Sequence, residues 1–190
     1  MIKTIASCTP CHRIALRAPG LPVALLAILL LVMIAPGTFP AQAAELTGVE
    51  TGLPLPRFVS LKSSKVNVRV GPSRNHAVVW VYQRKGLPVE VIAEFEHWRR
   101  IRDADGETGW IFHSLLDGDR TAILRPQRNE ETVPLYRLPD MRELVAAAED
   151  GVIGRVDACS VRLCQLVVGD YSGWVLKGNL WGVYGDEIFE

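Results

Sequence analysis

The second half of this chain repeats the pattern of the first half, and this duplication limits the possible folds more than any other feature. Gly109-Trp110-Ile111 returns 64 residues later as Gly173-Trp174-Val175. Three further segments return after 65 to 67 residues: 86–91 (GLPVEV) as 151–156 (GVIGRV), 98–101 (WRRI) as 163–166 (LCQL), and 66–69 (VNVR) as 133–136 (VPLY). Because the shift drifts by only three residues, we expect one architecture twice, with small changes in its loops. We predict two tandem domains, at residues 57–120 and 121–186.

Each half consists of short strand patterns separated by turn residues. Residues 66–70 (VNVRV) alternate apolar and polar side chains, and residues 77–82 (AVVWVY) are rich in β-branched and aromatic types. Residues 98–102 and 108–112 are joined by Asp103-Ala104-Asp105-Gly106, whose residue types favour a tight turn. The best helical candidate, residues 141–148 (MRELVAAA), would make only about two turns. The pattern therefore predicts an all-β barrel or sandwich in each half.

Residues 1–43 have the features of a secretory signal peptide. Three basic residues and no acidic residue precede the uncharged stretch 21–35 (LPVALLAILLLVMIA), and small residues follow at 41–44 (AQAA). We expect cleavage after Ala43, a linker at residues 44–56, and export to the periplasm or cell envelope. The alternative is that residues 21–35 are retained as an anchor, although a spanning helix usually needs about 20 apolar residues. In either case only this segment contacts the membrane.

Charge and cysteine content narrow the possible partners. Lys+Arg and Asp+Glu number 21 each, and this neutral balance argues against a nucleic-acid-binding protein. Cys8, Cys11 and His12 fit the haem-attachment pattern C-x-x-C-H, but they lie in the predicted signal peptide, so we expect no haem. Cys159 and Cys164 remain, on the two arms of a predicted hairpin. In an oxidising compartment this pair is expected to form a disulfide.

No residue pattern indicates catalysis, a metal site or a cofactor. His76, His97 and His113 are 21 and 16 residues apart, unlike the close spacing of zinc ligands. A catalytic cysteine needs a histidine partner, and the half that carries Cys159 and Cys164 contains no histidine. We therefore predict a protein that is not an enzyme and that holds no metal or cofactor.

The pattern V-N-V-R-x-G-P, followed by W-x-x-I and G-W-I, resembles the bacterial Src-homology-3-like (SH3b) domain family. The first copy carries this pattern at residues 66–72, 86–91, 98–101 and 109–111, and the second at 133–136, 151–156, 164–166 and 173–175. The resemblance implies an all-β fold of two tandem, partly open SH3-like barrels after the signal peptide. It also implies a module that binds peptidoglycan or envelope proteins. The second copy departs from the pattern, because Leu163 stands where the first copy has Trp98.

Aromatic and basic side chains of the first copy form the candidate ligand site. In SH3-type folds an aromatic shelf receives an extended ligand, and the candidates for this shelf are Trp80, Tyr82 and Trp98. Nine Lys and Arg residues lie between positions 62 and 102, against three glutamates, and this excess favours an anionic partner. We expect Arg69 and Arg99 to contribute. The alternatives are that the rings pack in the core and that the basic residues form a solvated surface.

The sequence thus predicts a periplasmic or cell-envelope binding module without catalysis, whose partner is peptidoglycan or an envelope protein. Two alternatives remain open. One is a structural protein of envelope assembly without affinity for murein. The other is an accessory part of a peptidoglycan hydrolase system.

Overall fold

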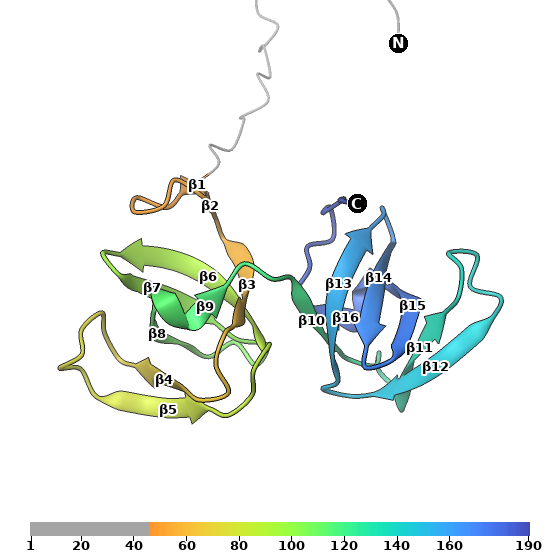
Figure 1. Ribbon diagram of the computed structural model, residues 1–190, viewed down its shortest axis with the longest axis horizontal. Coiled ribbons are helices and arrows are strands. Elements are labelled where there is room, and N and C mark those ends of the chain that lie inside the picture. The colour runs from red at the N-terminus through yellow and green to blue at the C-terminus, as the bar shows by residue number, and fades with distance from the viewer. Residues whose placement is uncertain (1–45) are drawn as a thin grey trace, which may run out of the picture. The chain divides into compact units, whose positions relative to one another are not determined.

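The computed structural model describes residues 46–190 (Figure 1). The described residues belong to one compact unit. The predicted signal peptide, its cleavage site and the C-x-x-C-H pattern lie outside the described residues. Between residues 46 and 190, no helix has both the length and the apolar character needed to cross a membrane. Within the predicted linker, β1 (Leu46–Thr47) and β2 (Pro54–Leu55) pair as a short antiparallel hairpin.

The first copy is an antiparallel sheet of seven strands in the order β5-β4-β8-β7-β6-β3-β9 (Figure 1). Its strands are β3 (Arg57–Leu61), β4 (Val66–Arg69), β5 (Val78–Tyr82), β6 (Pro88–Phe95), β7 (Trp98–Arg102), β8 (Thr108–Phe112) and β9 (Leu116–Asp117). A single 3-10 turn, His113–Leu115, joins β8 to β9.

The second copy repeats this order strand for strand, as β12-β11-β15-β14-β13-β10-β16 (Figure 1). Its strands are β10 (Thr121–Leu124), β11 (Thr132–Tyr136), β12 (Leu144–Glu149), β13 (Ile153–Cys159), β14 (Leu163–Val168), β15 (Tyr171–Leu176) and β16 (Leu180–Trp181). The 3-10 turn also recurs, at Lys177–Asn179. The predicted all-β fold and internal duplication are therefore confirmed.

Each copy buries its own apolar core. In β4, Val66 and Val68 are fully buried while Asn67 between them is exposed, as expected for a strand with one face on the core. Val133 and Leu135 of β11 take the same two positions in the second copy. The cores are completed by inward residues of the central strands, so each sheet has its own apolar interior.

The repeated Gly-Trp pair has a packing cause. A Cβ atom on Gly109 of β8 would lie 2.3 Å from Cγ1 of Val68, and one on Gly173 of β15 would lie 2.8 Å from Cβ of Leu135. Any side chain at these two positions would push the neighbouring strand away. Glycine therefore allows β4 to approach β8, and β11 to approach β15, at Arg69–Trp110 and Tyr136–Trp174.

The candidate helix at residues 141–148 is not formed. Most of it lies in β12, which pairs with β11 from Thr132–Glu149 to Tyr136–Leu144. Although Leu and Ala are good helix formers, intrinsic propensity is weak compared with the pairing and burial that β11 offers to this segment.

The two copies contact each other through a mixture of aromatic and polar groups. The ring of Phe58 lies 5.2 Å from that of Trp181 and 4.7 Å from that of Tyr184, measured between centroids. The Tyr184 hydroxyl donates a 3.0 Å hydrogen bond to the buried carboxylate of Glu90. Thr121 Oγ1 donates to the carbonyl oxygen of Gly86 at 2.8 Å.

The predicted disulfide between Cys159 and Cys164 is present. These residues face each other across β13 and β14, with their Cα atoms 4.0 Å apart. The equivalent cross-strand pair in the first copy is Glu94 and Arg99, which face each other across β6 and β7. A covalent bond in one copy thus occupies the place of an ion pair in the other.

Reduction of this disulfide should lower the free energy of unfolding by about 2 kcal/mol, because the loop that it closes is short and constrains the unfolded chain only modestly. Urea unfolding with and without reductant measures the change. The variant with both Cys159→Ala and Cys164→Ala is the control, and reductant should leave its midpoint unchanged. If reductant lowered the urea midpoint of the parent and of the double alanine variant equally, the Cys159–Cys164 disulfide would not be the source of the effect.

Candidate functional site

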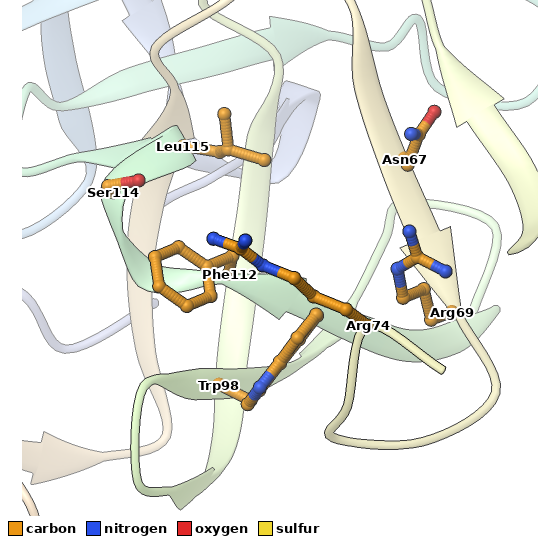
Figure 2. Close-up of a pocket in the computed structure, with 7 residues that line it drawn as sticks. All are labelled: Asn67, Arg69, Arg74, Trp98, Phe112, Ser114 and Leu115. Carbon is orange, nitrogen blue, oxygen red and sulfur yellow. The ribbon is translucent and has the colours of Figure 1, made fainter. Parts of the chain in front are cut away.

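A pocket of about 290 Å³ opens on the first copy (Figure 2). Strands β4, β7 and β8, the loop after β4 and the 3-10 turn after β8 contribute its walls, which combine aromatic, basic, aliphatic and small polar side chains. The lining residues are Asn67, Arg69, Arg74, Trp98, Phe112, Ser114 and Leu115. We call this the Trp98 pocket.

The aromatic wall follows from strand register. Trp98 begins β7 and Phe112 ends β8, and the two residues face each other across the strand pair. Their rings meet edge to face, with centroids 5.5 Å apart and an angle of 84° between planes. This geometry is favourable for aromatic pairs. Trp98 is 7% exposed, so it is both part of the core and a surface of the pocket.

Two guanidinium groups supply the positive charge. Arg69 ends β4, and its Nη1 donates to the carbonyl oxygen of His76. Arg74 lies in the following loop and extends across the pocket (Figure 2), with its guanidinium 5.5 Å from the centre of the Phe112 ring. This distance is within the range of a cation–π interaction. Within residues 46–190 neither arginine has a carboxylate partner, and no acidic side chain lines the pocket.

This arrangement suits an anionic group attached to an apolar one. Guanidinium groups bind carboxylates through paired, charge-assisted hydrogen bonds. The half-buried ring of Phe112 and the small exposed part of Trp98 offer an apolar surface for a sugar ring or an aliphatic stem. The pocket can therefore hold both parts of such a ligand at once.

The second copy has a pocket at the equivalent place, but its chemistry differs. Tyr136 and Leu176 take the places of Arg69 and Phe112, as the shared strand register shows. The pocket has a volume of about 180 Å³, and no basic side chain lines it, whereas Glu130 does. The cationic site is therefore a property of the first copy.

A family model described as "Bacterial SH3 domain" matches residues 62–118 and again residues 129–182. The chain belongs to the bacterial SH3 domain family. The two matches fall on the two copies, so the predicted resemblance is confirmed. Domains of this family generally act as binding modules for cell-wall or protein partners.

Two solved structures from Trichomonas vaginalis are similar at a distance, and no curated protein matches the chain. NlpC2 has a TM-score of 0.31 and 13% identity over 66% of this chain and 48% of its own. NlpC1 has a TM-score of 0.31 and 12% identity over 76% of this chain and 51% of its own. The chain thus spans about half the length of either protein.

Of the five residues predicted for ligand binding, Trp98 and Arg69 line the Trp98 pocket. Trp80 and Tyr82 lie together on β5, with centroids 6.1 Å apart, and pack against the core of the first SH3 domain. The Tyr82 hydroxyl donates a 2.7 Å hydrogen bond to Asp103. Burial, together with this bond, raises the pKa of Tyr82 well above its usual range. The structure thus separates these two rings from the pocket.

The fifth residue, Arg99, follows Trp98 on β7, is buried, and does not line the pocket. Its exposure is 7%, and its Nη1 donates to the carbonyl oxygens of Glu96 and Trp98 at 2.8 and 2.9 Å. In the pocket it is Arg74 that accompanies Arg69. Arg74 is one of the nine cations counted in the sequence, whereas Phe112 carried no signal beyond its place at the end of a predicted strand. Ligand binding by all these residues stays a prediction.

Glu94 explains the burial of Arg99. The side chain of Glu94 has no exposed surface, and its Oε1 lies 2.8 Å from Nη2 of Arg57 and 3.4 Å from Nε of Arg99. It also accepts hydrogen bonds of 3.0 Å from the backbone N–H groups of Glu50 and Thr51 and one of 2.7 Å from the Thr51 hydroxyl. Glu94 therefore holds the segment before β2 against the tip of the β6–β7 hairpin.

Burial alone would raise the pKa of Glu94, but the hydrogen bonds from Thr51, Arg57 and the backbone outweigh it and lower the pKa to about 2. A carboxylate with a lowered pKa stabilises the folded state above its ordinary value of 4.5, and this contribution is lost as the pH falls from 4.5 towards 2.

We expect Glu94→Gln to lower stability at neutral pH and to weaken the acid dependence of stability between pH 4.5 and about 2. Urea midpoints measured at several pH values test this expectation. Glu107→Gln, at an exposed position in the β7–β8 turn, is the matched control and should retain the dependence of the parent protein. An unchanged acid profile in Glu94→Gln would rule out this role.

Within residues 46–190, His76, His97 and His113 are not grouped as three metal ligands would be. His97 and His113 lie side by side, with ring centroids 5.5 Å apart, and both are exposed. His76 lies in the loop that carries Arg74. Across the part of the chain that the structure describes, no three His, Cys, Asp or Glu side chains are grouped as metal ligands would be.

Proposed function

We propose that this protein is a non-catalytic binding module of the bacterial cell envelope, and that the Trp98 pocket recognises peptidoglycan through the carboxylates of its peptide stems. The observation that carries the proposal is the pair Arg69 and Arg74 above an aromatic wall, with no carboxylate in the lining. Peptidoglycan offers anionic peptide stems beside sugar rings, which are the two chemistries that the pocket can hold.

Two sequence features support the location and the absence of catalysis in this proposal. The charge and apolar pattern of residues 1–43 is that of an export signal. The two SH3 copies account for most of the remaining chain, whose residues include no nucleophile and base at a spacing typical of an enzyme. An acidic surface of an envelope protein is the alternative ligand, since it also presents carboxylates.

Sedimentation with purified insoluble murein tests the proposal. The protein should be retained at low salt and released as salt is raised, because exposed charge contacts are screened. We expect Arg74→Glu to weaken retention by about ten-fold, equivalent to the loss of one charge-assisted contact. Arg128→Glu, an exposed arginine between β10 and β11, is the matched control and should bind as the parent does.

Each other outcome has a definite meaning. If all the protein stays in the supernatant, murein is not the ligand, and the envelope-protein or assembly alternative gains. Equal losses in Arg74→Glu and Arg128→Glu would assign retention to overall charge rather than to the pocket. Murein whose free carboxylates have been amidated should no longer retain the protein in the pellet. Clearing of a cell-wall suspension by the purified protein would contradict the absence of catalysis.

A further inference from the structure

The second SH3 domain contains an apolar hollow that the first domain fills with its own side chains. The hollow has a volume of about 310 Å³ and lies between β12 and the β14–β15 turn. Its lining is formed chiefly by Leu135, residues 146–148, Val152, Val168 and Tyr171. It is distinct from the second-domain pocket at Tyr136 and Leu176, with which it shares no lining residue.

The strand register shows which aromatic side chains of the first domain the second domain lacks. Val68 of the first domain faces Trp80 across β4 and β5, whereas the equivalent Leu135 faces Ala146. In the next inward position along the same strand pairs, Tyr82 of the first domain corresponds to Ala148, which faces Val133. Trp80 and Tyr82 pack against the first core, and methyl groups stand in their places in the second.

The first domain indicates aromatic side chains as the occupant of the hollow, whose volume of about 310 Å³ is at the lower end of the range for ligand pockets. The same scaffold accommodates one indole and one phenol ring at this position in the first domain. Aromatic rings entering from outside would therefore restore the packing that the first domain has.

The acidic residues at and near the hollow favour a cationic ligand. Glu149 lines the hollow, and Asp150 and Asp170 are exposed beside the strands that form it. Glu131 immediately precedes Thr132, which pairs with Glu149. The lining includes no basic residue, so a segment that carries both rings and cations is complementary to this surface.

The position of β12 allows such a segment to approach. β12 is the terminal strand of its sheet and pairs with β11 on one side only among the described strands. Its Leu144 is 58% exposed at the end of the edge. An extended peptide can lie along an edge strand and place alternate side chains in one pocket. This is also the spacing of Trp80 and Tyr82 on β5.

We propose that this hollow is a docking site for a basic, aromatic segment of a partner protein, whose ring side chains occupy the places that Trp80 and Tyr82 occupy in the first domain. This site is separate from the Trp98 pocket, so the two domains have different classes of ligand: an anionic group for the first and a cationic, aromatic peptide for the second.

The test uses a short peptide, acetyl-Lys-Trp-Lys-Tyr-Lys-amide, and the full protein with labelled alanine methyl groups. We expect the methyl resonances of Ala146 and Ala148 to shift and saturate as peptide is added. Peptides with both rings replaced by alanine, or all lysines by glutamate, should bind at least about ten-fold more weakly, because each lacks one of the two complementary features.

Two variants locate the binding. Ala146→Trp supplies the missing indole from within and should abolish peptide binding while murein retention stays at the level of the parent. Glu149→Lys, at an exposed position that does not affect the core, should reduce binding of the basic peptide and improve binding of the acidic one. It keeps the proposal falsifiable if Ala146→Trp does not fold.

Several results would overturn the proposal. Peptide binding that persists in folded Ala146→Trp, or resonance shifts confined to β5 or to the Trp98 pocket, would place the peptide elsewhere. Equal affinity for the basic and acidic peptides would remove the role of the acidic rim. Concentration-dependent dimers that Ala146→Trp abolishes would make a second copy of this chain the occupant instead of a different protein.

Discussion

The close approach of β4 to β8 at Gly109 is the contact on which the Trp98 pocket depends. Arg69 faces Trp110 at this point, and the exposed side of β4 therefore lies beside the ends of β7 and β8. Without this approach, the guanidinium of Arg69 would not lie beside the aromatic wall. The same approach recurs at Gly173, so both domains have a pocket at the same place whatever residues line it.

The duplication preserved the scaffold and changed the surfaces. Residues 57–120 carry 11 basic and 8 acidic residues, whereas residues 121–190 carry 7 basic and 11 acidic residues. The changes fall at equivalent positions: Arg69 becomes Tyr136, Phe112 becomes Leu176, and Trp80 becomes Ala146. Two domains with one strand order therefore offer unlike surfaces, which favours two ligands over two copies of one ligand.

Sequence reasoning predicted the features that depend on local pattern. The duplication and the β strands follow from residue spacing, and the disulfide was predicted from the placement of the two cysteines and the expected export of the chain. It did not predict that Arg99 turns inward, because Trp98 and Arg99 are both buried and strand alternation assigns only one of two neighbours to the core. The cause is Glu94, which draws Arg99 into a network with a segment some fifty residues earlier in the chain. Arg74 reaches Phe112 through a loop conformation, and no periodicity describes a loop.

The hairpin tips of the two domains are closed by different chemistry, and they will therefore fail under different stresses. Acid removes the charge that Glu94 needs to hold the N-terminal segment, but it leaves the bond between Cys159 and Cys164 intact. Thiols reduce that bond, whereas the tip of the first domain contains no disulfide for them to reduce. Acid therefore weakens the tip of the first domain without breaking the covalent bond at the tip of the second, and a thiol reductant does the reverse. The stability of the first tip thus depends on pH, and the stability of the second depends on the redox potential of the surroundings.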